Sequence, residues 1–199
     1  MHNINFSYYL DMVSNVLLLL AILLNIPRMA QLKLYIKLII ILFVVFISIT
    51  VPFYMGSNLL WLMRGMLENI SITTTLFLFI LLLNNLCQFS TKPLINTPSA
   101  AILVIICTIL YLSVFGIIPI DVYDLGFVPN VYFLCILGIV LLIIWRFSNL
   151  NAWILLIAFI TYYFRLKDSI NLWDYLIDPL LWVYAIIFLF KQLVYKRFC

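Results

Sequence analysis

Polar and ionisable side chains recur at helical spacing in two stretches of an otherwise apolar chain. Spacings of three and four residues place such side chains on one face of a helix. The first stretch holds Arg64, Glu68, Ser71 and Thr75, and the second holds Asn171, Asp174 and Asp178. Near the start of the chain, Asp11, Ser14 and Asn15 also share one face. Ionisable groups within apolar segments normally face a bundle interior or water, so these positions are candidates for a polar site.

The chemistry open to these side chains is acid–base chemistry or electrostatic binding. Asp174 or Asp178 offers a base toward a hydroxyl group, and Arg64 offers a holder for a phosphate or carboxylate. The sequence contains no GxSxG, HExxH or SxxK motif and no phosphate-binding glycine loop. Enzymatic activity is therefore uncertain, a non-enzymatic role is favoured, and no catalytic residue is assigned.

Metal and cofactor sites lack the ligands that they need. His2 is the single histidine, and the four cysteines form no CxxC pair. Haem sites and the usual zinc sites therefore have no ligand set, and we predict no metal and no cofactor. The eleven Lys and Arg residues are spread along an apolar chain, which excludes a basic nucleic-acid-binding patch.

Composition places the chain in a membrane. Of its 199 residues, 67% are hydrophobic and 9% are charged, and the mean hydropathy is +1.25. These values lie far outside those of soluble domains. We predict an all-α fold, a polytopic bundle of transmembrane helices that forms one domain over residues 1–199. At about 20 residues per crossing, this length holds six or seven spans.

Seven apolar runs are the expected crossings: 9–26, 38–54, 59–86, 100–120, 131–145, 150–166 and 172–190. The third run, at about 42 Å of helix, exceeds a hydrocarbon core of about 30 Å. Its first turns, up to Glu68, are expected at the outer interface or along a cavity. The sixth run, at about 25 Å, is the least certain crossing. Gly56-Ser57-Asn58 predicts a turn before the third run.

Basic residues set the expected orientation, with the N-terminus outside and the C-terminus in the cytoplasm. Seven crossings place eight Lys and Arg residues inside and three outside, whereas six crossings give seven and four. Seven spans are therefore favoured and six are the alternative. The absence of a cleavable signal and of retention motifs favours a bacterial inner membrane.

Acidic residues give an independent observation, because they contribute little to insertion. In the seven-span topology all seven fall on the outer side. We therefore expect a polar, acidic pocket open to the outer face, formed by Arg64, Glu68, Asp174, Asp178, Asp11, Ser71, Thr75 and Asn171. Pro179 frees the carbonyl of Tyr175 and is expected to kink the last span.

A purely structural interpretation remains open for the same residues. Arg64 would pair with Glu68 one turn away, and Asp174 and Asp178 would lie among lipid headgroups. The aromatic residues would then form an interfacial belt. This belt consists of Tyr8, Tyr9, Phe53, Tyr54, Trp61, Tyr162, Tyr163, Trp173 and Tyr175.

The functional expectation is an accessory or binding subunit of a membrane assembly. Its partners are the lipid bilayer and another membrane protein or a second copy. A small transporter or oligomeric channel is the alternative, and an outer-leaflet transferase or hydrolase that uses carboxylates is a third hypothesis. The apolar inner halves of the spans exclude a pore through one chain, and the sequence names no ligand, partner or oligomeric state.

Overall fold

The computed structural model describes residues 3–54, 56–67, 70–87 and 93–198. These residues fold into helices and one two-stranded hairpin, so the all-α prediction is confirmed. The chain divides into two compact units. The first unit contains residues 1–70 and 75–92, and the second contains residues 71–74 and 93–199.

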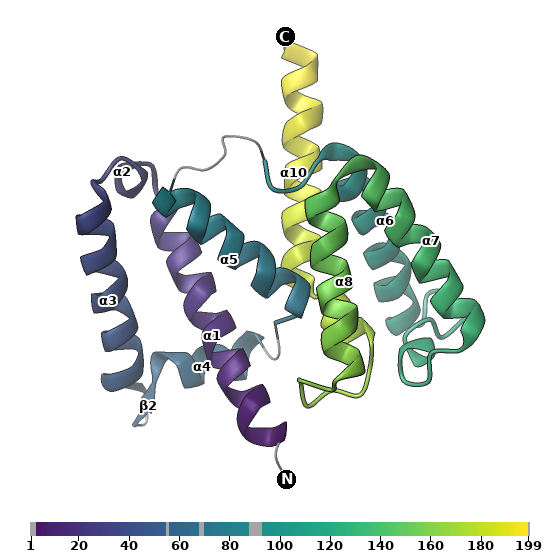
Figure 1. The fold of residues 1–199 in the computed structure, drawn as a ribbon, viewed down its shortest axis with the longest axis horizontal. Helices are drawn as coiled ribbons and strands as arrows, with labels where there is room; N and C mark the ends of the chain where they lie inside the picture. The colour runs from purple at the N-terminus through teal and green to yellow at the C-terminus, as the bar shows by residue number, and fades with distance from the viewer. Residues whose placement is uncertain (1–2, 55, 68–69, 88–92, 199) are drawn as a thin grey trace. The chain divides into compact units, whose positions relative to one another are not determined.

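Helices of the first unit pack around α1 (Figure 1). Its elements are α1 (Asn3–Leu24), α2 (Pro27–Ala30), α3 (Leu34–Thr50), β1 (Pro52–Tyr54), β2 (Ser57–Asn58), α4 (Leu59–Leu67) and most of α5 (Ile72–Cys87). Both α3 and α4 contact α1. The ammonium of Lys37 on α3 donates to the carbonyl of Asn85 on α5 (2.8 Å), which connects two segments distant in the sequence.

The predicted turn after the second apolar run is a short antiparallel hairpin of β1 and β2. Gly56 adopts a φ of +78°, a left-handed conformation that glycine takes without a steric penalty. The Asn58 side chain then accepts a hydrogen bond from the backbone N–H of Trp61 (3.1 Å). This bond satisfies one free donor at the start of α4.

The third apolar run is two helices, so the predicted continuous helix over 59–86 is wrong. α4 ends at Leu67 and α5 begins at Ile72. Ser71 explains the new start, because its hydroxyl accepts a hydrogen bond from the N–H of Thr74 (3.1 Å) in the manner of an N-cap. Arg64 and Thr75 therefore belong to different helices, and the predicted single polar stripe does not form.

The long helices of the second unit pack as two pairs (Figure 1). Its elements are α6 (Thr97–Val114), η1 (Asp124–Gly126), α7 (Val131–Phe147), α8 (Asn149–Tyr163), α9 (Trp173–Leu176) and α10 (Pro179–Phe198). The closest helix pairs are α6 with α10 and α7 with α8. Between α6 and α10, the indole of Trp182 donates to the hydroxyl of Thr108 (3.2 Å).

Pro179 begins a helix and does not kink one, which corrects the prediction for the last span. α9 ends at Leu176, Ile177 is extended (φ −138°, ψ 143°), and α10 starts at Pro179. Proline suits the first position of a helix because the missing N–H would have no partner there. The Tyr175 carbonyl accepts a hydrogen bond from the Thr73 hydroxyl (3.4 Å).

α6 ends at Val114, six residues before the predicted end of the fourth run. Gly116 turns the chain with a φ of +70°. The Ser113 hydroxyl donates to the Ile120 carbonyl (2.7 Å) and accepts from the N–H of Val122 (2.8 Å), which holds the turn against the helix end.

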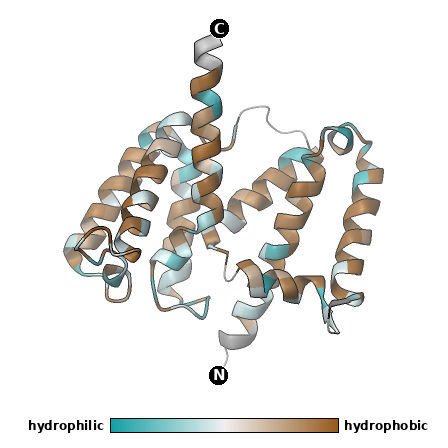
Figure 2. Cartoon of the chain, turned by 180° about the vertical axis from the view of Figure 1, so that it is seen from behind, coloured by the Kyte–Doolittle hydropathy of each residue, from teal (hydrophilic) through white to brown (hydrophobic). Residues whose placement is uncertain are grey.

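Two helices are long and apolar enough to cross a membrane, Phe6–Leu24 and Thr97–Val114. Five further apolar helices are shorter, at 10–17 residues, so the seven-span bundle is not confirmed. A core helix of a soluble protein or a signal sequence meets the same criterion. Hydrophobic residues cover most of each helix around its circumference and not only one stripe (Figure 2).

Candidate functional site

In the first unit, the buried face of α1 changes from polar to apolar along its length. Ser7, Asp11, Ser14 and Asn15 are buried along its N-terminal part, and Leu17, Leu20, Ala21 and Leu24 follow on the buried side. Burial of four polar residues on one face is costly unless each finds a partner. The partners of these side chains therefore show whether this face is structural or still able to bind.

Asp11 forms the centre of this polar face, with 1% of its surface exposed. A guanidinium nitrogen of Arg64, on α4, lies 3.4 Å from its carboxylate. The guanidinium carbon also lies 5.0 Å from the ring centre of Tyr8, a cation–π distance. Arg64 is about a quarter exposed, so the positive end of this group reaches the surface of the unit while the carboxylate does not.

Asn15 lies one turn beyond Asp11 and is wholly buried. Within the part of the chain that the structure describes, neither its amide nitrogen nor its amide oxygen has a hydrogen-bond partner. Next to it in the sequence, the hydroxyl of Ser14 lies 2.7 Å from that of Thr75 on α5. We call Asp11, Arg64, Ser14, Asn15 and Thr75 the first-unit cluster. The Asn15 amide of this cluster is a buried donor and acceptor that can still bind a further polar group.

Asp178 organises the polar region of the second unit. One oxygen of its carboxylate accepts from the N–H of Leu181 (2.7 Å), which caps α10. The other accepts from the N–H of Ser71 (2.8 Å), just before α5. A carboxylate near a helix N-terminus is also favoured by the helix dipole. The position of Asp178 is therefore explained by the helix start that it stabilises.

Asp174 and Asn171 join the loop before α7 to the segment before α10. The hydroxyls of Tyr123 (3.0 Å) and Ser169 donate to the Asp174 carboxylate. The Asn171 amide donates to the Tyr123 carbonyl (3.1 Å) and accepts from the N–H of Trp173 (2.9 Å). Both side chains thus use their hydrogen-bonding capacity inside the unit.

Tyr175 connects the same segment to the loop after α8. Its hydroxyl donates to the carbonyl of Lys167 (3.0 Å) and accepts from the N–H of Lys167 (3.0 Å), and Ser169 supplies a second carbonyl at 3.2 Å. Burial raises the pKa of the Tyr175 phenol, so the hydroxyl keeps its proton at neutral pH.

Two residues of the predicted interfacial belt are buried, Trp173 and Tyr175. The Trp173 indole donates to the Val122 carbonyl (2.9 Å), as the Tyr175 hydroxyl donates to its own loop. Both rings therefore pack inward, because their polar atoms bond to backbone within the unit, and their place in an interfacial belt stays a prediction.

The structure places seven of the eight predicted site residues. Asp11, Arg64 and Thr75 belong to the first unit, and Ser71, Asn171, Asp174 and Asp178 belong to the second. Glu68 lies outside the described residues, and so does its proposed pairing with Arg64. One shared outer pocket remains a prediction.

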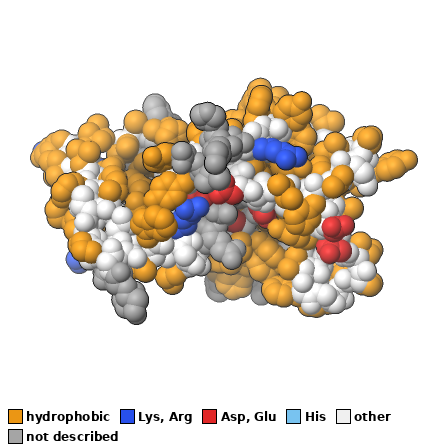
Figure 3. Space-filling view, turned by 90° about the horizontal axis from the view of Figure 1, so that it is seen from below, with side chains coloured by type: hydrophobic (Ala, Val, Ile, Leu, Met, Phe, Trp, Pro, Cys, Tyr) orange, Lys and Arg blue, Asp and Glu red, His pale blue; other side chains and the backbone are white. Residues whose placement is uncertain are grey.

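In the second unit, the described acidic residues gather at one end. These are Asp121, Asp124, Asp168, Asp174 and Asp178, in the loops at the end of α6 and α8 and the start of α7 and α10. Figure 3 views that end and shows acidic side chains in red among hydrophobic ones in orange. Asp11 lies in the first half of α1, in the first unit.

Sequence reasoning did not name Tyr123, Gly126 and Ser169 of the second-unit region, and it named Tyr175 only for its carbonyl and as part of the aromatic belt. A Cβ on Gly126 would lie 2.6 Å from Trp173 Cδ1 and would also clash with Asn171, so only glycine fits. The local signal was the turn-forming composition of the loop before α7 and of the loop after α8. This composition gives no information about which loops contact each other.

No group of three or more His, Cys, Asp or Glu side chains that could hold a metal ion occurs among the described residues. Comparisons of the chain with models of known families, with curated proteins and with solved structures find no match.

Proposed function

We propose that this chain is an integral membrane protein and acts as a binding or accessory subunit, with the first-unit cluster as its binding site. Large apolar side chains point outward along several helices, among them Leu42, Phe46, Ile105, Leu142, Ile187 and Phe190. Soluble monomers rarely expose such continuous apolar surface. A surrounding bilayer, or the spans of a partner, would cover it.

The distribution of charge supports an orientation for each unit. In the second unit, Arg146 and Lys191 lie toward the helix ends opposite the acidic loops. In the first unit, Arg28, Lys33 and Lys37 lie between α1 and α3 or at the start of α3, away from Asp11. The positive-inside rule then puts these basic ends in the cytoplasm and the acidic ends outside.

Seven crossings correspond to the long helices α1, α3, α5, α6, α7, α8 and α10. At 15 residues, α8 is about 22 Å long, shorter than a core of about 30 Å, so a six-span form remains the alternative. The last crossing would begin at Pro179, because α9 and Ile177 precede it outside the continuous helix.

Asn15 is the observation that carries the binding role. Most buried polar groups in proteins have a hydrogen-bond partner, and the exceptions need an explanation. Beside this amide, Asp11 and Arg64 provide one negative and one positive group. A ligand or a partner side chain that both donates and accepts hydrogen bonds, such as an amide or a hydroxyl, matches the Asn15 amide.

The carboxylates proposed for catalysis support this non-enzymatic role. Both oxygens of Asp178 accept from backbone N–H groups, and Asp174 accepts from two hydroxyls. A general base must reach the proton of its substrate, and these carboxylates are directed to the chain itself.

Native mass spectrometry of the full chain, purified in mild detergent from its native host, tests the proposal. We expect a stoichiometric partner or a retained polar molecule on the wild-type chain and its loss in Asn15→Leu. Asn25→Leu is the matched control, because Asn25 is exposed just after the end of the same helix and its amide donates to the Ala21 carbonyl of that helix, away from Asn15. A bare wild-type chain that transports a solute in proteoliposomes would instead favour the transporter hypothesis.

A further inference from the structure

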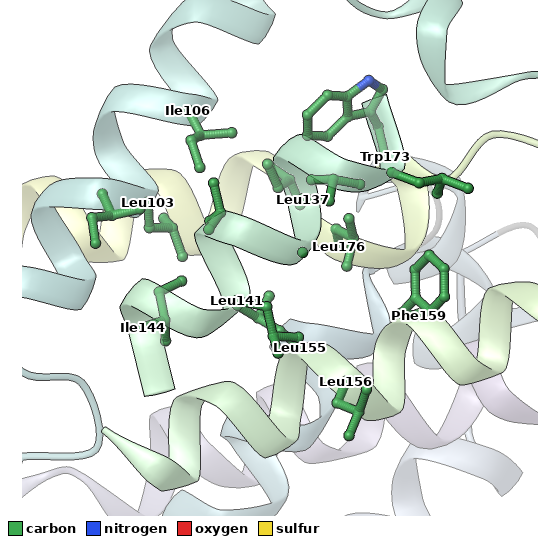
Figure 4. Close-up of a pocket in the computed structure, with 15 residues that line it drawn as sticks. Leu103, Ile106, Leu137, Leu141, Ile144, Leu155, Leu156, Phe159, Trp173 and Leu176 are labelled. Atoms are coloured by element: carbon green, nitrogen blue, oxygen red, sulfur yellow. The ribbon is translucent and has the colours of Figure 1, made fainter. Parts of the chain in front are cut away.

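The second unit contains a partly open apolar cavity of about 270 Å³ between α6, α7, α8 and α9. Figure 4 shows fifteen residues that line it, with Leu103 and Ile144 at one end and Trp173 and Phe159 at the other. Every lining side chain is apolar apart from Gly138, which has none. A cavity lined in this way favours an apolar occupant over water.

The length of the cavity matches one acyl chain. Its lining residues on α7 run from Leu134 to Ile144, about 15 Å along a helix axis. A hydrocarbon core of about 30 Å consists of two leaflets, so the acyl chains of one leaflet span about 15 Å. The cavity thus has the depth of a single leaflet.

One end of the cavity is closed by α9. Trp173, Leu176 and Ile177 line it there. Trp173 is fixed by two bonds, from its indole to the Val122 carbonyl and from its N–H to Asn171. A polar headgroup therefore has no place at this end.

The other end of the cavity approaches unpartnered polar groups. Ser99 lies three residues before the lining residue Ile102, and Asn151 lies four residues before Leu155, so helical spacing places each on the cavity face of its helix. They are 3% and 4% exposed. Among the described residues, neither the Ser99 hydroxyl nor the Asn151 amide has a hydrogen-bond partner.

A positive charge lies at this same end. Arg146 is exposed in the last turn of α7. Its spacing of two residues from Ile144 places it on another face of the helix from the cavity lining, so its side chain would meet a headgroup beyond the helix end and not inside the cavity. The Asn96 side chain donates to the Phe147 carbonyl (2.7 Å), which holds the start of α6 against the end of α7. Arg146, Ser99 and Asn151 therefore belong to one end of the helix group.

We propose that this cavity binds one acyl chain of an anionic phospholipid, taken from the leaflet on the Arg146 side. The acyl chain lies between α6, α7 and α8 with its methyl end toward Trp173. Ester and phosphate oxygens accept from Ser99, Asn151 and Arg146. The inference rests on the membrane location of the proposed function but not on the first-unit cluster, so either site can fail without the other.

Lipid retention on the purified full chain tests the site. Delipidated protein in detergent is offered phosphatidylglycerol or phosphatidylcholine with identical acyl chains, and the bound lipid is counted by native mass spectrometry. We expect one phosphatidylglycerol per chain and at least about tenfold weaker binding of phosphatidylcholine. Quenching of tryptophan fluorescence by a brominated acyl chain, weakened in Trp173→Phe, would place the acyl chain beside α9.

Gly138→Phe is the variant designed to fill the cavity, because Gly138 lines it and an added Cβ meets no atom within 4 Å. It should reduce phosphatidylglycerol binding about tenfold or more. Ile139→Phe is the matched control, since Ile139 is exposed on the same helix and does not line the cavity. Equal binding by wild type, Gly138→Phe and Ile139→Phe would overturn the proposal.

Arg146→Gln separates headgroup binding from folding, because Arg146 is exposed. It should remove the preference for phosphatidylglycerol, whereas Lys191→Gln on α10 should keep it. A preference unchanged in Arg146→Gln would overturn the headgroup assignment.

Binding of oleate but not of phosphatidylglycerol would overturn the phospholipid source. A chain that leaves the membrane on carbonate washing contradicts the proposed function, while an embedded chain without bound lipid contradicts only this site.

Discussion

The region around Asp178, Asn171 and Tyr175 in the second unit and the first-unit cluster differ in how completely their buried polar groups are hydrogen-bonded. In the second unit, Asp178, Asn171 and Tyr175 each bind backbone groups of the same unit. In the first-unit cluster, Asn15 is equally buried, yet its amide has no partner among the described residues.

This difference separates a structural region from a candidate binding site, although both consist of buried polar side chains. A satisfied buried hydrogen bond adds about 1 kcal/mol to stability, whereas an unsatisfied buried group costs about 1–3 kcal/mol. Substitutions of Asp178, Asn171 and Tyr175 should therefore lower the free energy of unfolding. Substitution of Asn15 should reduce binding without that loss.

Asp178→Ala should have the largest effect on stability. It leaves two buried N–H donors, of Ser71 and Leu181, without an acceptor and removes the cap of α10. We expect a loss of about 3 kcal/mol in the free energy of unfolding, measured by thermal unfolding in detergent. Asp121→Ala is the control, because Asp121 is exposed and its loss should cost less than about 1 kcal/mol. Equal effects would contradict the structural role of Asp178.

Gly126→Ala should follow, with a loss of about 2 kcal/mol in the free energy of unfolding. The added methyl group would overlap Asn171 and Trp173, which hold the two loops together. Gly138→Ala tests the same substitution where no atom lies within 4 Å, and it should stabilise α7 by up to about 1 kcal/mol. Both are compared by thermal unfolding, and a harmless Gly126→Ala would show that the loops separate easily.

Tyr175→Phe should cost about 1.5 kcal/mol, because the N–H of Lys167 loses its acceptor and two carbonyls lose their donor. The loop after α8 should then be cleaved faster in limited proteolysis. Tyr163→Phe, at an exposed position of α8, should leave the cleavage rate unchanged. Unchanged cleavage in Tyr175→Phe would mean that other contacts hold this loop.

Asn15→Leu and Asn171→Leu compare the two units directly, since both amides are wholly buried. Asn171→Leu should cost about 2 kcal/mol because it breaks bonds to Tyr123 and Trp173. Asn15→Leu should leave stability within about 1 kcal/mol of wild type or raise it, since no bond to a described residue is lost. Thermal unfolding distinguishes them, and an equal loss in both variants would remove the argument for binding at Asn15.

Much of the fold follows from local sequence. Apolar runs predicted the long helices, and Gly56 predicted the turn before α4. Two helix starts within apolar runs were missed, although Ser71 and Pro179 are local signals for a start. Hydropathy is similar on both sides of each break, so it gave no reason to divide the runs.

The candidate site was predicted by residue type but not by partner. Asp11, Arg64 and Thr75 were named, and the structure groups them in one unit. Nothing in the spacing of Arg64 pointed to Asp11, because these residues lie on different helices. Tyr123 and Tyr175 were not recognised as partners of loops, since aromatic residues at the ends of apolar runs are typical of an interface.

The sequence by itself determined the apolar character of the helices and the acidic composition of one set of loops, because both are sums over neighbouring residues. Only the tertiary structure decided which buried polar groups are satisfied. The N–H of Ser71 and the carboxylate of Asp178 are 107 residues apart in sequence, yet they form one hydrogen bond. Packing within the first unit leaves the Asn15 amide unpartnered among the described residues, and packing within the second forms the partly open cavity between α6, α7 and α8.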